Sequence, residues 1–103
     1  MREKLEARDV SKGISLQSSL QICQYVVSRD LDGEAVILNL ETGTYFGLNE
    51  AGTRIWSLIQ EHGSLRRVFD AMQKEYEVSP EALESDLLRI ADELRAKGLV
   101  SVS

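Results

Sequence analysis

The feature that most constrains the fold is a pair of tight-turn signals separated by the length of one strand. Asp32-Gly33 lies between two apolar runs, and Thr42-Gly43 follows as a second, weaker signal. Aspartate followed by glycine is a strong hairpin signal, because both central positions of such a turn favour positive φ. The segment between the two turns is apolar on both faces, which is typical of a central strand. The sequence therefore predicts a three-stranded antiparallel meander over residues 23–30, 34–41 and 44–48.

Helical periodicity replaces strand periodicity at Asn49, whose side-chain oxygen can cap a helix. A first helix is expected over 50–61, ended by His62-Gly63. Ser64 and Ser79-Pro80 indicate the starts of a second helix and of a third over 80–97. The second helix has an apolar stripe of Leu65, Val68, Phe69, Met72 and Tyr76; the third has one of Leu83, Leu87, Ile90, Ala91 and Leu94.

The two ends of the chain are less determined. Residues 1–13 carry seven charges and indicate a flexible arm, followed by one domain over 14–103. Residues 14–22 fit either an extra strand or an extended lead-in, and residues 99–102 fit either a short final strand or a segment packed on the core. Together these elements predict a small α+β domain of winged-helix-like character.

Composition narrows the function. A net charge of −5 argues against nucleic acid as the main partner, because phosphate binding requires clustered Lys and Arg. No apolar run is long enough for a membrane span, and the first residues lack the apolar segment of a signal peptide. The single Cys23 excludes an internal disulfide and fits a reducing cytoplasm. We therefore expect a cytoplasmic protein with no nucleic-acid or membrane partner.

No catalytic or metal-binding constellation is visible. His62 is the only histidine and Cys23 the only cysteine, so neither a nucleophile–base pair nor a metal ligand set can form from them. The acidic residues of the third helix are spread over its outer faces, as solvated charges are. The expectation from these residues is a binding module that is not an enzyme and has no cofactor and no metal.

The stretch Leu-Asp-Gly-Glu-Ala-Val-Ile-Leu-Asn-Leu, then Thr-Gly-Thr-Tyr-Phe-Gly-Leu-Asn, then Gly52 and Ile55-Trp56, resembles the PqqD-like family. The resemblance covers about residues 20–102, and the sequence looks nearest to the stand-alone members linked to lasso-type and other modified peptides. Membership would imply a chaperone that binds the leader of a ribosomally made precursor peptide. It would present that peptide to a maturation enzyme such as a radical SAM enzyme, a cyclase or a leader protease.

The resemblance also implies where the peptide binds. The third strand of the meander has one unpaired row of backbone groups, to which an extended peptide can add as a further strand. In the family the peptide also contacts the third helix. The residues expected to bind peptide are therefore Thr44, Tyr45, Phe46, Gly47, Leu48, Glu84, Leu88, Ala91, Asp92 and Arg95. Tyr45 and Phe46 point to opposite faces of the strand, so one of them should pack inward and the other should border the groove. The sequence leaves open which residue does which.

The main alternative is a winged-helix regulator that binds DNA. Its weakness is the acidic balance of the third helix, which would repel phosphate. An enzyme of unrecognised type is a third, weaker reading. We expect a monomer in dilute solution, with an edge-to-edge or swapped dimer as the alternative at crystal concentrations.

Overall fold

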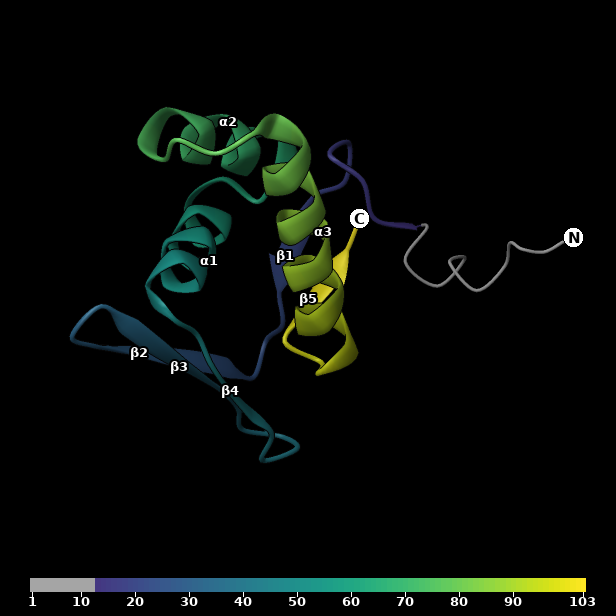
Figure 1. The fold of residues 1–103 in the computed structure, drawn as a ribbon. Helices are drawn as coiled ribbons and strands as arrows, with labels where there is room; N and C mark the ends of the chain where they lie inside the picture. Colours follow the sequence, from purple (N-terminus) through teal and green to yellow (C-terminus); the bar gives the residue numbers. More distant parts are fainter. Residues whose placement is uncertain (1–12) are drawn as a thin grey trace, which may run out of the picture.

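The computed structural model describes residues 13–103, which form three helices and five short strands (Figure 1). The predicted arm falls almost entirely outside these residues. The order of the elements is β1 (Leu20–Ile22), β2 (Val26–Leu31), β3 (Glu34–Asn39), β4 (Tyr45–Gly47), α1 (Glu50–His62), α2 (Leu65–Glu75), α3 (Pro80–Ala96) and β5 (Val100–Val102). The predicted α+β class is confirmed.

The predicted meander is present as the antiparallel sheet β2–β3–β4. Asp32 and Gly33 have φ values of 58° and 85°, so the hairpin turn has the positive φ angles that the sequence predicts. All three strands are shorter than predicted or begin later. The first does not include Cys23, because the Cys23 carbonyl accepts the Val26 N–H in a turn and the Cys23 N–H donates to Leu99 O instead.

The middle strand ends at Asn39 and not at residue 41. The side-chain oxygen of Asn39 accepts the N–H groups of Glu41 and Thr42, and this local bonding turns the chain out of the sheet. Leu40 therefore lies in a turn and is exposed, although its alternation with Val36 and Leu38 placed it in the strand.

A second, two-stranded sheet joins the ends of the domain. β1 pairs antiparallel with β5, so that Leu20 lies opposite Val102. The undecided segments 14–22 and 99–102 thus each contribute one short strand. The N–H of Leu20 donates to Gly63 O on the other side of β1, which ties the loop between α1 and α2 to this sheet.

The three helices begin where the sequence predicts. Asn49, Ser64 and Ser79 each accept a hydrogen bond from a backbone N–H in the first turn of the helix that follows. Tyr76 departs most clearly from the predicted helical stripes. It follows the last residue of α2 in an extended conformation and is exposed, so it does not belong to the buried stripe.

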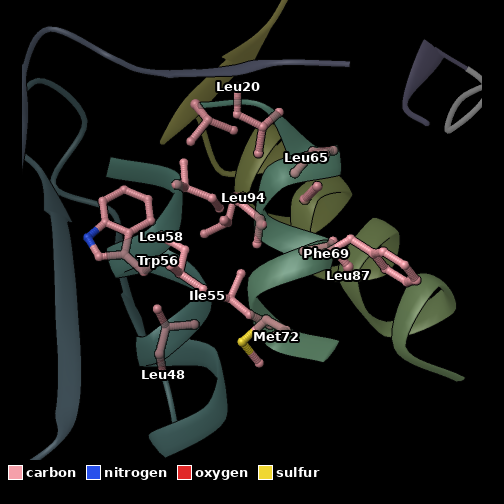
Figure 2. Packing of buried hydrophobic residues seen from close by; sticks show 14 of the residues in the cluster. Leu20, Leu48, Ile55, Trp56, Leu58, Leu65, Phe69, Met72, Leu87 and Leu94 are labelled. Atoms are coloured by element: carbon pink, nitrogen blue, oxygen red, sulfur yellow. The ribbon is translucent and has the colours of Figure 1, made fainter. Parts of the chain in front are cut away.

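The core lies among the three helices, the inner side of the meander and the β1–β5 sheet. Figure 2 shows buried side chains from α1, α2, α3 and β1 in mutual contact. Ile37 of β3 is fully buried, and Trp56 of α1 packs in the same core while its indole N–H donates to Ser28 Oγ at 3.2 Å. This packing holds the meander against α1 and defines which of its faces is left outside.

Candidate functional site

The meander has two faces of different character. Ala35, Ile37 and Asn39 of β3 are buried toward the helices, and Phe46 lies opposite Ile37 on this inner face. The other residues of β3 point the opposite way, together with their neighbours across the sheet. We call this second side the outer face; it comprises Val27, Arg29, Leu31, Glu34, Val36, Leu38 and Tyr45.

Strand β4 is an edge strand, hydrogen-bonded within the described sheet only to β3. Asn39 N–H donates to Thr44 O, and Leu48 N–H donates to Ala35 O. Hydrogen-bonded pairs alternate along an antiparallel ladder, so the backbone N–H and C=O groups of Phe46 point toward β3, as those of Thr44 and Leu48 do. The backbone N–H and C=O groups of Tyr45 and Gly47 therefore point away from β3, along the free edge of the sheet.

The C-terminal end of α3 lies beside β4. The ammonium group of Lys97, the residue that ends α3, lies 5.4 Å from the centroid of the Phe46 ring, within cation–π distance. The Asn39 amide N–H donates to Gly98 O at 3.0 Å. Phe46 is therefore the residue of this pair that packs inward, half-buried toward α3, whereas Tyr45 is on the outer face with 69% of its surface exposed.

One flank of α3 also lies close to the start of α1. Asp86 and Ile90 of α3 line a mostly apolar groove of about 240 Å³ together with Asn49 and Ile55. Asn49 comes two residues after the end of β4. Residues three, four and seven apart share one side of a helix, so Asp86, Ile90 and Lys97 form the α3 flank that faces β4 and α1.

The α3 residues predicted to bind peptide lie on the opposite flank. Leu88 and Asp92 line a hollow with Ile14 of the N-terminal segment, and the Arg95 guanidinium lies beside Gly13 and hydrogen-bonds to Asp92. Glu84 is exposed one turn before Leu88. The structure does not bring these four residues opposite β4.

Two of the predicted residues belong to the core. Ala91 is fully buried, and Leu48 is buried in the same hydrophobic cluster, so neither side chain offers surface to a peptide. The sequence pattern placed Ile90 in the buried stripe of the third helix, but Ile90 is half-buried. Helical periodicity identifies the buried stripe but gives no signal for which of its two flanks lies toward β4.

The described residues show no grouping typical of a catalytic or metal centre. Between residues 13 and 103, no cluster of three or more His, Cys, Asp and Glu side chains could hold a metal ion. Hydrogen bonds from Arg54 hold the pKa of Glu75 below its ordinary value, but this pair links the surfaces of α1 and α2. No helix in this part of the chain is long and apolar enough to cross a membrane.

Two solved structures of similar fold contain a bound leader peptide. A solved structure described as TbiB1 in complex with the TbiA(beta) leader peptide is 42% identical, with a TM-score of 0.75, over 79% of this chain and 94% of that one. A lasso peptide synthetase B1 complexed with its leader peptide shares the fold, with a TM-score of 0.73 at 22% identity over 81% of this chain and 98% of that one. No curated protein matches significantly.

Neither structure supports the DNA-binding alternative. The family model described as coenzyme PQQ synthesis protein D (PqqD) matches residues 34–100, which include the meander from β3 onward and all three helices. On this match, and on its similarity to TbiB1, the chain belongs to the PqqD family.

Proposed function

We propose that this protein binds the leader segment of a ribosomally made precursor peptide as an added strand on β4 and presents it to a maturation enzyme. The observation that carries the proposal is the free backbone of Tyr45 and Gly47 at the edge of the meander. Such an edge can pair with an extended peptide, whose main-chain hydrogen bonds supply affinity while side-chain pockets supply selectivity.

The comparison with TbiB1 supports the same reading. That protein is 42% identical to this chain and was solved with a leader peptide bound. Gly47 strengthens the argument from the chain itself, because nothing lies within 4 Å of the place where its side chain would be. A second backbone can therefore approach the edge at this position without displacing a side chain.

The proposed groove consists of β4 and the α3 flank that faces it. Its β4 wall is residues 44–48, with the Phe46 ring on the groove side, and its α3 wall is Asp86, Ile90 and Lys97. Glu84, Leu88, Asp92 and Arg95 have no place in this groove because they face the N-terminal segment or solvent. We propose Asp86, Ile90 and Lys97 in their place.

Methyl groups on the two flanks of α3 provide a direct test. The leader of a precursor peptide encoded beside this chain would be titrated into protein labelled at Ile and Leu methyl groups. The Ile90 methyl and the amides of Tyr45 and Gly47 should shift, while the Leu88 methyls stay in place. Saturable shifts confined to α2, between Leu65 and Glu75, would show that the peptide docks elsewhere.

The partner enzyme belongs to the same proposal. Leader binding is useful only if a peptide-modifying enzyme follows, and a radical SAM enzyme, a cyclase and a leader protease are the candidate classes.

We propose that the protein itself is non-catalytic and acts in the cytoplasm, where precursor peptides are made. We also propose that it is monomeric in dilute solution, with edge-mediated dimers as the alternative at high concentration. Turnover of a precursor by the purified protein alone would contradict the non-catalytic role.

A further inference from the structure

The outer face of the meander is apolar but no described element covers it. Val27, Leu31 and Tyr45 are exposed over 48%, 55% and 69% of their surfaces, and Val36 and Leu38 lie half-buried between them. In the register of the sheet, Leu38 lies directly between Val27 and Tyr45. Figure 1 shows the helices grouped on the other side of this sheet. The solvated face of an antiparallel sheet is usually polar, and an exposed apolar patch on a protein surface often marks an interaction site.

We infer that the outer face is the docking surface for the peptide-modifying enzyme, and that the bound leader completes it. This inference rests on the proposed addition of the leader to β4. In an added strand, successive side chains point to opposite faces. One set would enter the groove beside Phe46, and the other set would join the outer face next to Tyr45.

The size of the face favours a partner that also contacts the leader over a second copy of this chain. Three short strands present a face on the order of 300 Å², from their spacing and rise. A stable protein–protein interface buries about 800 Å² on each partner. The outer face alone therefore falls well short of a stable homodimer. An enzyme that holds the outer face and the leader together would bury the additional area on the peptide.

One charge in the apolar face adds a chemical requirement on the partner. Arg29 is exposed on the outer face opposite Val36, and it has no ion-pair partner among residues 13–103. Glu34 is the other charged residue on this face and lies at the hairpin end, opposite Leu31. The expected partner surface is apolar with a carboxylate placed to meet Arg29. Such a pair would become stronger as the interface excludes water.

The test separates leader binding from enzyme docking. The probes are the leader peptide and the peptide-modifying enzyme that are encoded beside this chain. Val27→Glu places a charge in the outer face, and Gln21→Glu places the same charge at an exposed position of β1 as the matched control. Wild type and both variants should bind labelled leader with affinities within twofold of one another.

Enzyme capture should then distinguish the variants. With saturating leader, wild type and Gln21→Glu should each bind the enzyme at least tenfold more tightly than they do without leader. With saturating leader, Val27→Glu should bind the enzyme at least tenfold more weakly than wild type does. Arg29→Glu should lose affinity too, while Arg29→Lys should retain most of it. These two variants keep the test valid if Val27→Glu does not give a cooperative thermal transition.

The contrary outcomes have different meanings. Wild type that fails to bind any leader would remove the proposed function and this inference together. Normal leader binding with enzyme capture unchanged in Val27→Glu and Arg29→Glu would overturn this inference alone. A tight homodimer in sedimentation that Val27→Glu dissociates would also overturn it, because the occupant would then be a second copy of the chain.

Discussion

The two sheets of this domain both contain three-residue strands, but they differ in how the backbone of those strands is satisfied. β1 is hydrogen-bonded on both sides. On one side it pairs with β5, and Ser19 and Ser103 exchange two further backbone bonds beyond the strand ends. On the other side Leu20 N–H donates to Gly63 O. β4 pairs with β3 alone and directs the polar groups of Tyr45 and Gly47 outward. Strand length is therefore the same in the two sheets, and the difference lies in the second row of backbone groups, which is bonded in β1 and free in β4 within the described residues.

The largest effect is expected for a proline in the closed sheet. Gln21 is exposed, and the bonding pattern on either side of it directs its N–H to Ser101 of β5. Gln21→Pro removes this bond and leaves a carbonyl without a donor, so the free energy of unfolding should fall by about 2–3 kcal/mol. Urea denaturation measures the loss, with Gln21→Ala as the control that keeps the N–H. Equal stability of the two variants would show that β1 is not held by its backbone bonds.

The same substitution in the open sheet should affect binding more than stability. Gly47→Pro and Tyr45→Pro each remove an outward N–H, so both should keep a cooperative thermal transition close to that of wild type. Each should lose at least tenfold in leader affinity, which corresponds to about 1.4 kcal/mol. Phe46→Pro is the control in the same strand, because it removes an inward N–H and should destabilise the sheet. Wild-type leader binding by both outward variants would exclude strand addition on β4.

A smaller effect should distinguish the two flanks of α3. Ile90 and Leu88 are both half-buried, but Ile90 lines the groove near α1 and Leu88 lies beside Ile14. Truncation to alanine should destabilise the fold by similar amounts in both cases. Only Ile90→Ala should weaken leader binding, by roughly fivefold or about 1 kcal/mol, as lost apolar contact predicts. Isothermal titration of both variants gives the comparison, and equal loss in both would remove the assignment of one flank.

Sequence reasoning was reliable where a few adjacent residues determine the geometry. The Asp32-Gly33 turn and the caps at Asn49, Ser64 and Ser79 depend on local backbone and side-chain preferences, and all four are found as predicted. The inward direction of Phe46 could not be assigned in this way. It depends on the register between β3 and β4, in which Phe46 lies opposite the buried Ile37.

The errors arise where distant segments decide. The pairing of β1 with β5 joins residues about eighty positions apart, and no local pattern identifies such a partner. The choice between the two flanks of α3 depends on distant segments in the same way. Leu88 and Ile90 lie on either side of one buried stripe; Leu88 lines a hollow with Ile14 of the N-terminal segment, and Ile90 lines the groove near α1.

The smallest expected effect is a control far from both sheets. The Arg54 side chain makes two hydrogen bonds to Glu75, at 2.8 and 2.6 Å, and they lower the pKa of Glu75. A lowered carboxyl pKa in the folded state stabilises the fold above the unfolded-state pKa of about 4.3, and this stabilisation is lost as the pH falls through the folded-state pKa. The pair is exposed, so Arg54→Ala should cost less than about 1 kcal/mol at pH 7. The cost should shrink toward zero in denaturation at acid pH, and leader affinity should not change.

The Asn39 side chain has a consequence for the kind of peptide that this groove admits. Its amide N–H donates to Gly98 O after α3, and its oxygen accepts two N–H groups of the turn that leads to β4, so one buried residue connects the two walls of the proposed groove. A peptide side chain too bulky for that separation would have to break a buried hydrogen bond before it could enter. If the leader binds in the proposed groove, Asn39 would therefore limit the size of the leader side chains that enter it from a buried position beneath the turn.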